Sequence, residues 1–147
     1  MIKAVLDTNV LVSAFLYGGP PLDVLDLAEA KVVEIYTSED AIAELQAVLS
    51  RDKFAGRLRS LRLSVSTIVS LYSGLAVMIT PAVVPGICSD PRDEEFIAIA
   101  LAAGADAIVS GDRHLLDCSD TSPVPVLTTS EFLLVVRDTM QQEPPSG

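Results

Sequence analysis

Four acidic residues lie at positions from which their carboxylates could gather into one site. Asp7 and Asp112 each come at the end of a short apolar run, Glu44 lies in IAELQAVL, and Asp93 lies in DPRDEEF. An ionised carboxylate among apolar residues is costly unless it is paired, hydrogen-bonded or bound to a metal. Whether the four acids can meet depends on the elements that carry them.

Short apolar runs alternate with longer helical patterns, which predicts a parallel sheet with helices on both faces. The runs are continuously apolar, as two-sided burial requires. The predicted strands are residues 2–6, 32–36, 75–79, 107–110 and 124–127. The predicted helices are residues 9–17, 22–30, 38–50, 57–74, 93–103 and 130–138. The sequence therefore predicts an α/β protein.

Asp7 and Asp112 each lie where a predicted strand ends. Ligands of parallel α/β folds bind beyond the carboxyl ends of the strands, so both acids are expected on the ligand side. Each position also has a local explanation. Asp7 or Thr8 could cap the next helix, and Asp112 could be an ordinary turn residue after Gly111. Taken singly, each acid favours its local explanation.

The other two acids lie on predicted helices. Glu44 falls on the edge of an apolar helical stripe, from which it can reach a cleft at the end of the sheet. Asp93 shares one side of its helix with the apolar residues Phe96, Ile97 and Ala100. A capping role after Asp90 is the local alternative. Asp93 is therefore expected to face the core and the cleft, whereas Glu94 and Glu95 are expected to be solvated.

Taken together, the four acids indicate a metal site. In a parallel sheet all four could converge at one end, where like charges repel strongly. A hard divalent cation with oxygen ligands, Mg²⁺ or Mn²⁺, would relieve that repulsion. The single histidine, His114, is interpreted as a surface residue. The two cysteines, Cys88 and Cys118, lack the spacing of a zinc site or a disulfide framework.

The length of 147 residues fits one domain, predicted to span residues 1–140, with a polar, proline-rich tail at 141–147. No apolar stretch reaches the roughly 18–20 residues of a membrane helix, and the N-terminus lacks the pattern of a signal peptide. We therefore expect a cytoplasmic protein that does not enter a membrane.

The net charge of −10 argues against broad, non-specific binding of nucleic acid. Five of the ten basic residues nevertheless lie between residues 51 and 62. A local basic patch on an acidic protein is compatible with a phosphate-bearing ligand. A solvated helical face is the alternative.

The chain resembles the PIN-domain family of metal-dependent ribonucleases, from Ile2 to about Val136. LDTNVLVSA is similar to the family's opening motif, and IAELQAVL to the segment with the second acid. DPRDEEFIAIALAAGADAIVSGDRHLL resembles the segment that carries the third and fourth acids. The form DPRDEEF…SGDRHLL is similar to a branch described as the toxin component of toxin–antitoxin pairs. The resemblance implies a three-layer α/β/α fold with a central parallel sheet of about five strands.

The resemblance also implies a catalytic site, in which one or two Mg²⁺ or Mn²⁺ ions support hydrolysis of RNA phosphodiester bonds. The catalytic residues and metal ligands would be Asp7, Glu44, Asp93 and Asp112. The polar neighbours that orient them or contact a bound water would be Thr8, Asn9 and Ser110. The family further implies a cognate antitoxin and a homodimer. The basic residues that could hold the RNA backbone are Arg51, Lys53, Arg57, Arg59, Arg62, Arg92 and Arg113.

Three rival functions fit parts of the same pattern. A phosphatase with an aspartate nucleophile would need a second acid at position 9, where this chain has Asn9. A phosphoryl-accepting receiver module would need a lysine near the last strand, and residues 124–130 contain none. A catalytically weak or inert PIN-fold scaffold that binds RNA or protein stays open, and metal-dependent RNA cleavage would distinguish it from the enzyme.

Overall fold

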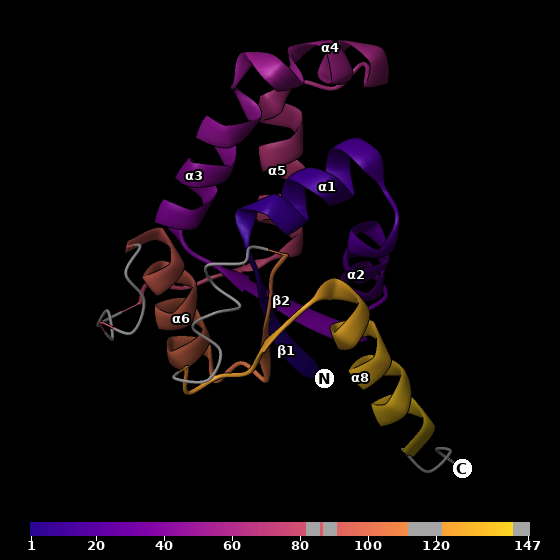
Figure 1. The fold of residues 1–147 in the computed structure, drawn as a ribbon, viewed down its shortest axis with the longest axis vertical. Coiled ribbons are helices and arrows are strands. Elements are labelled where there is room, and N and C mark those ends of the chain that lie inside the picture. The colour runs from indigo at the N-terminus through magenta and orange to yellow at the C-terminus, as the bar shows by residue number, and fades with distance from the viewer. Residues whose placement is uncertain (82–85, 87–90, 112–121, 143–147) are drawn as a thin grey trace.

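Five parallel strands form one sheet at the centre of the computed structural model, which describes residues 1–81, 86, 91–111 and 122–142 (Figure 1). The strand order is β3-β2-β1-β4-β5, and every neighbouring pair is parallel. The strands are β1 (Ile2–Leu6), β2 (Val33–Thr37), β3 (Val77–Met78), β4 (Ala107–Val109) and β5 (Val126–Leu127). The predicted three-layer α/β/α fold with a five-stranded parallel sheet is confirmed.

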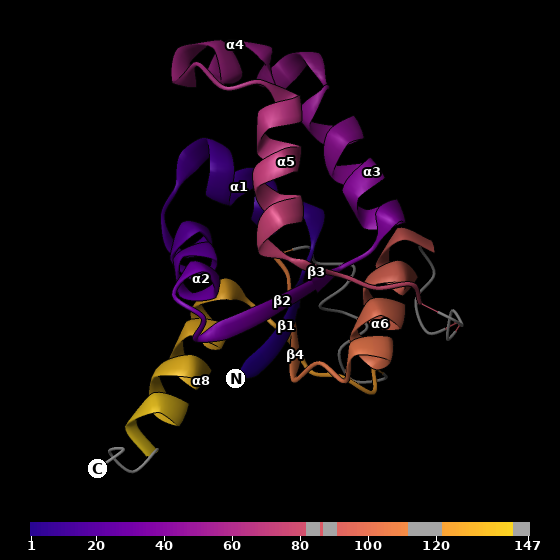
Figure 2. The same cartoon turned by 180° about the vertical axis from the view of Figure 1, so that it is seen from behind.

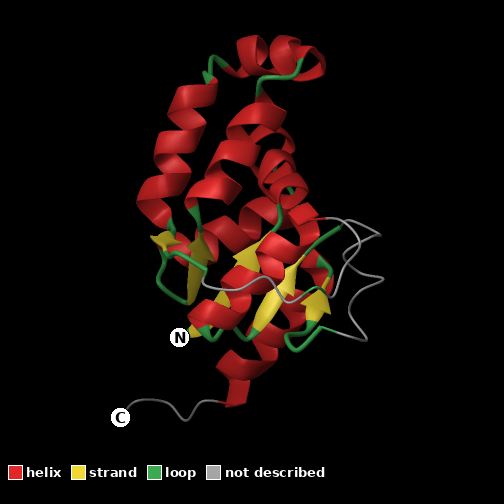
Figure 3. Cartoon of the chain, turned by 90° about the vertical axis from the view of Figure 1, so that its left-hand side faces the viewer, coloured by secondary structure: helices red, strands yellow, loops and turns green. Residues whose placement is uncertain are grey.

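Helices connect these strands and cover both faces of the sheet, as the views from front and back show (Figures 1 and 2). The described helices are α1 (Thr8–Tyr17), α2 (Pro20–Glu29), α3 (Glu39–Leu49), α4 (Asp52–Leu61), α5 (Val65–Leu75), α6 (Pro91–Ala103) and α8 (Thr129–Gln142). In Figure 3 the strands lie in the lower half of the molecule, and a helical projection that ends in α4 rises above them.

The central strand β1 supplies side chains to two separate cores, because successive residues of a strand point to opposite faces. Ala4 and Leu6 pack with residues of α1, α2, α3, α5 and α8 on one face. Val5 packs with Ile97 and other residues of α6 on the opposite face. Burial on both faces explains why the strand reads as an unbroken apolar run.

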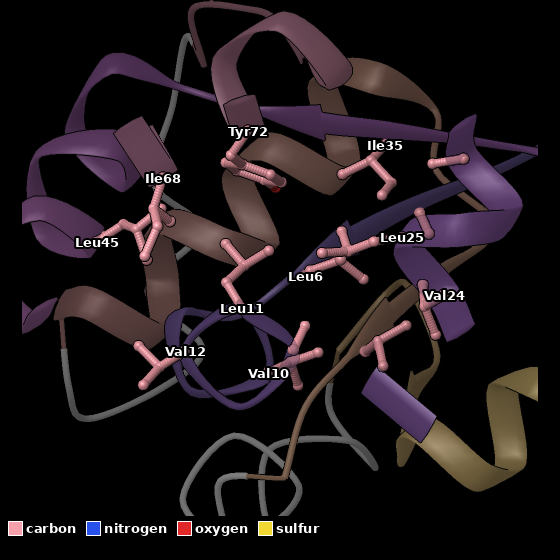
Figure 4. Close-up of a cluster of buried hydrophobic side chains, with 14 of the residues drawn as sticks. Leu6, Val10, Leu11, Val12, Val24, Leu25, Ile35, Leu45, Ile68 and Tyr72 are labelled. Atoms are coloured by element: carbon pink, nitrogen blue, oxygen red, sulfur yellow. The ribbon is translucent and has the colours of Figure 1, made fainter. Parts of the chain in front are cut away.

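The larger core lies between the sheet and the helices α1, α2, α3 and α5. Figure 4 shows Leu6 and Ile35 of the sheet facing Leu11 of α1 and Tyr72 of α5. All four side chains are at most 3% exposed. This packing fixes the start of α1 next to the end of β1, where Asp7 lies.

The helix predicted at residues 57–74 is two helices. Arg62 ends α4 in the left-handed region, with φ of 56°, and Ser64 begins α5 by accepting a hydrogen bond from the Thr67 N–H. α4 also begins earlier than predicted, at Asp52. Since α5 runs to Leu75, strand β3 keeps only two of the five residues predicted for it.

Other boundaries also differ from the sequence prediction, among them the start of α2 and the end of α8. α2 begins at Pro20 rather than at Leu22, after Gly18 and Gly19, whose positive φ angles turn the chain. Proline suits the first position of a helix, where its missing N–H costs nothing. α8 runs to Gln142, two residues into the stretch predicted as a tail. The domain limits of 1–140 otherwise stay a prediction.

No single helix in the described part of the chain is long and apolar enough to span a membrane. Helices α1 and α2 reach that length only as a pair, across a bend of 94°.

Candidate functional site

Asp7 lies directly after β1, and its side chain is only 3% exposed. Its Oδ1 accepts a hydrogen bond of 3.0 Å from the Val10 N–H, so Asp7 caps α1 as its local explanation predicted. Its Oδ2 accepts a hydrogen bond from the Ser110 hydroxyl, which follows β4. The same carboxylate therefore has both properties. Its Oδ1 caps α1, and its Oδ2 is bonded to Ser110 at the carboxyl edge of the sheet.

Glu44 is brought to the same edge of the sheet by Thr8. The Thr8 hydroxyl donates a hydrogen bond of 2.7 Å to Glu44 Oε2. Thr8 is buried at the start of α1, and Glu44 is half-buried on α3, as its predicted place on the rim of the helical stripe requires. Because Thr8 follows Asp7 in the chain, the bond sets the Glu44 carboxylate beside the end of β1.

Three consecutive acids in the first turns of α6 have three different environments. Asp93 is 6% exposed, so its predicted burial is confirmed. The prediction that Glu94 is solvated is wrong, because Glu94 is 3% exposed and its Oε2 accepts a hydrogen bond of 2.6 Å from the Gly86 N–H. A backbone donor compensates the burial of this carboxylate, and helical periodicity cannot reveal such a donor.

Glu95 is half-buried rather than solvated. Its Oε1 accepts a hydrogen bond of 2.6 Å from the Ser38 hydroxyl. Ser38 follows β2 and is 2% exposed. The partner is thus a buried hydroxyl 57 residues away, which the spacing within α6 could not have shown.

The ends of β1, β2 and β4 therefore place Asp7, Ser38 and Ser110 at the carboxyl edge of the sheet. Within the described residues, no three Asp, Glu, His or Cys side chains form a group that could hold a metal ion. Asp112, Arg113 and His114 lie outside the described part of the chain, as do Cys88, Cys118 and the side chain of Arg92. The candidate ligands that the structure describes, Asp7, Glu44 and Asp93, would all bind through carboxylate oxygens, which suits a hard cation such as Mg²⁺ or Mn²⁺.

A family model for the PIN domain matches residues 3–114 of this chain, and these residues include β1, Glu44, α6 and the stretch after β4. The chain belongs to the PIN-domain family. The resemblance drawn from the four acidic positions is thereby confirmed. PIN domains are nucleases and generally use divalent metal ions.

Other proteins resemble this PIN domain over most of their length. Uncharacterized protein MJ1680 of Methanocaldococcus jannaschii is 31% identical over 120 residues, which cover 81% of this chain and 76% of that protein. Among solved structures, VapBC2 from Rickettsia felis, bound to a DNA fragment from its promoter, is similar with a TM-score of 0.58 and 18% identity, over 86% of this chain and 97% of that chain.

Two further structures share the fold. FitAcB from Neisseria gonorrhoeae has a TM-score of 0.57 and 18% identity, over 86% of this chain and 98% of that chain. PAE2754 from Pyrobaculum aerophilum has a TM-score of 0.57 and 13% identity, over 93% of this chain and 96% of that chain. At these identities the likeness shows the fold alone.

Asn9 of this PIN domain is exposed, unlike its neighbours Asp7 and Thr8. It lines an open pocket of about 250 Å³ together with Ser13 of α1 and Gly111 after β4. Asn9 is therefore placed to meet a molecule that approaches the carboxyl edge of the sheet.

The basic residues of α4 are not brought to this edge. α1 and α3 both run away from the carboxyl edge of the sheet toward α4, which lies at the far end of the helical projection beyond that edge (Figures 1 and 2). From Asp7 to Leu16 the chain advances roughly 14 Å along α1. The five basic side chains near α4 are exposed there: Arg51, Lys53, Arg57, Arg59 and Arg62.

Arg57 differs from the other basic residues of α4 because its contacts reach another helix. Its Nε donates a hydrogen bond of 2.7 Å to the carbonyl oxygen of Leu16, and its guanidinium lies 5.2 Å from the centre of the Tyr17 ring. Arg57 therefore fastens α4 to the end of α1. The patch offers four further cations to a ligand: Arg51, Lys53, Arg59 and Arg62.

Proposed function

We propose that this PIN domain is an endoribonuclease that hydrolyses RNA phosphodiester bonds with Mg²⁺ or Mn²⁺. The observation that carries the proposal is the buried Asp7 carboxylate at the end of β1, which accepts hydrogen bonds from the Val10 N–H of α1 and from the Ser110 hydroxyl after the neighbouring strand β4. Membership of a nuclease family supports the reaction class. The chemistry follows from the ligands that these carboxylates would supply to a cation.

Carboxylate oxygens are ligands that hard divalent cations prefer, so Asp7 would supply the first ligand. Glu44, held by Thr8 at 2.7 Å, would supply a second ligand, and Asp93 and Asp112 a third and a fourth. One or two bound ions would activate a water and stabilise the charge that develops on the phosphate. Val10, Ser110 and Thr8 would hold the carboxylates in place, so that little reorganisation is needed when substrate arrives.

The RNA backbone would extend from the carboxyl edge of the sheet toward α4. Asn9 lies beside the site, and α1 extends roughly 14 Å from Asp7 to Leu16, where Arg57 joins α4 to α1. Phosphates further along the strand from the cleaved bond could reach the four cations of the α4 patch, which would bind the backbone whatever its base sequence. Arg92 and Arg113, next to the acids in sequence, would contact phosphates closer to the cleaved bond.

The biological setting that best fits is a type II toxin–antitoxin pair in the cytoplasm. VapBC2 and FitAcB, which share the fold, are the basis for this proposal. A cognate antitoxin would inhibit the nuclease by occupying the groove at the carboxyl edge, and the nuclease would act as a homodimer. The proposal includes no membrane partner.

A second candidate function is a PIN-fold scaffold that binds RNA or protein with little or no catalysis. It is favoured by the finding that no three acids converge on a metal position within the described residues. The two candidates differ in one outcome: the nuclease would cleave RNA when a divalent cation is present, whereas the scaffold would bind RNA with little or no cleavage.

The test is incubation of the purified chain with total RNA, with Mg²⁺, with Mn²⁺ and with a chelator. The nuclease should cleave RNA only when the cation is present, and Glu44→Gln should lose most of that activity. Asp40→Asn, at an exposed position on the same helix, is the matched control and should cleave like the wild type. RNA that stays intact under all conditions, but is retained by the protein, would favour the scaffold.

A further inference from the structure

The Ser38 hydroxyl connects the N-terminal parts of two helices. Its oxygen accepts a hydrogen bond of 3.1 Å from the Ala41 N–H, which caps α3. The same hydroxyl donates a hydrogen bond of 2.6 Å to Glu95 Oε1 in α6. Ser38 is 2% exposed and Glu95 is half-buried, so the bond is largely shielded from water.

These two helices belong to different layers of the fold. Leu45 and Leu49 of α3 pack in the core that includes α1 and α5. α6 packs in the core on the other face of the sheet, which Ala41 alone joins from α3. The direct contact between α3 and α6 is small and lies at the carboxyl edge of the sheet, and the Ser38–Glu95 bond is part of that contact.

Each helix also carries one of the acids assigned to the metal site. Glu44 is on α3, five residues after its first residue, and Asp93 is the third residue of α6. A shift of α6 relative to α3 would change the separation of these two carboxylates. Side chains that orient metal ligands typically contribute about 10- to 100-fold to metal affinity.

We propose that Glu95 is a positioning residue which, through its hydrogen bond from Ser38, holds Glu44 and Asp93 at the separation that a divalent cation requires. The inference rests on the proposed metal-dependent function. It concerns the acceptor oxygen of Glu95 and not its charge. Glu95 itself touches neither cation nor substrate.

The test measures the dissociation constant of Mn²⁺ by titration of the whole chain. Glu95→Ala removes the acceptor and should weaken Mn²⁺ binding about tenfold. Glu95→Gln removes the charge but keeps an acceptor oxygen for Ser38, so its affinity should stay close to that of the wild type. Glu39→Ala, an exposed acid in the first turn of α3, is the control for the loss of one negative charge and should change affinity little.

Two results would overturn the inference while leaving the proposed function intact. If Glu95→Gln weakened Mn²⁺ binding as much as Glu95→Ala, Glu95 would act through its charge. If Glu95→Ala bound Mn²⁺ as tightly as the wild type, the bond would not position the ligands. A wild-type chain that bound no Mn²⁺ would overturn the proposed metal site together with this inference.

A double-mutant cycle tests the bond itself without a metal. Ser38→Ala, Glu95→Ala and the double variant are compared by their midpoints of urea unfolding in metal-free buffer. Since Ser38 also caps α3, its single substitution should lower the midpoint more than that of Glu95. The two effects should be non-additive, and strictly additive effects would contradict the coupling.

Discussion

The hydroxyl of Ser110, which follows β4, donates a hydrogen bond to the carboxylate of Asp7, which follows β1. Both side chains are buried, at 0% and 3% exposure. The bond joins the carboxyl ends of two neighbouring strands at the place where a parallel α/β fold binds its ligands.

Ser110→Ala should lower the free energy of unfolding by about 1–3 kcal/mol, because a buried carboxylate oxygen loses a donor. Chemical denaturation at neutral pH measures this change. In the Asp7→Asn background the same substitution should cost less, since the charged acceptor is already gone. An equal cost in both backgrounds would show that the hydroxyl stabilises the fold independently of Asp7.

Thr8→Val should release Glu44 while keeping the size and branching of the side chain. Loss of the 2.7 Å hydrogen bond should lower the free energy of unfolding by about 0.5–1.5 kcal/mol. The rate of RNA cleavage should fall further than stability explains, because Glu44 would no longer be fixed beside Asp7. Thr8→Ser keeps the hydroxyl and should preserve most of the activity. Equal activity of the valine and serine variants would contradict an orienting role.

Tyr72→Phe should make the protein more resistant to alkaline unfolding. Burial raises the pKa of the Tyr72 hydroxyl above its ordinary value of about 10. Because the pKa is higher in the folded than in the unfolded state, the folded state loses stability progressively as the pH rises above about 10. The unfolding midpoint of the wild type should therefore fall more steeply above pH 10 than that of Tyr72→Phe.

At neutral pH the same substitution should leave stability unchanged or slightly raised. The Tyr72 hydroxyl is buried near Thr37, but among the described residues it makes no contact with hydrogen-bond geometry. Removing an unsatisfied buried hydroxyl relieves its desolvation cost. A clear loss of stability for Tyr72→Phe at pH 7 would show that the hydroxyl does have a partner.

The basic residues of α4 should separate into one structural residue and a set that binds RNA. Arg57→Ala should lower the free energy of unfolding by about 1 kcal/mol, because it loses its bond to Leu16 and its contact with Tyr17. Arg59→Ala should change stability by less than about 0.5 kcal/mol. Thermal or chemical unfolding of both variants checks the difference.

For RNA binding we expect the opposite order, in which loss of Arg59 weakens binding more than loss of Arg57. With Asp7→Asn to prevent cleavage, removal of Arg59 and Arg62 should weaken binding of a single-stranded RNA at low salt. Each side chain that neutralises a phosphate should, when removed, reduce the slope of log affinity against log salt by about 0.7. Fluorescence anisotropy over a salt series measures both quantities. An unchanged slope would remove α4 from the RNA-binding surface.

The sequence was sufficient for the sheet, for the place of Asp7 at its carboxyl edge and for the burial of Asp93, because these follow from local patterns. The burial of Asp7 itself was not predicted. Unbroken apolar runs indicate strands buried on both faces, and a helical spacing of three and four residues indicates the side that faces the core. The same reasoning placed Glu44 on a helix rim, where the structure has it half-buried.

The environments of Glu94 and Glu95 could not be predicted in this way. Their partners are the Gly86 N–H, which precedes the helix, and the Ser38 hydroxyl, which is 57 residues away. Periodicity within α6 contains no information about donors on other elements. The break at Arg62 was missed for a related reason, since a left-handed arginine has no distinctive sequence signal, although Ser64 is a typical helix cap.

The central claim is that the Asp7 carboxylate binds the cation that RNA cleavage requires. The most direct measurement compares Asp7→Asn with Asp40→Asn for Mn²⁺ affinity and RNA cleavage on the same samples. Because Asn keeps an oxygen that can accept from Val10, the fold should persist in metal-free buffer, while Mn²⁺ binding and cleavage should both be lost. Asp40→Asn should match the wild type in both. Cleavage that continues in Asp7→Asn would contradict the claim.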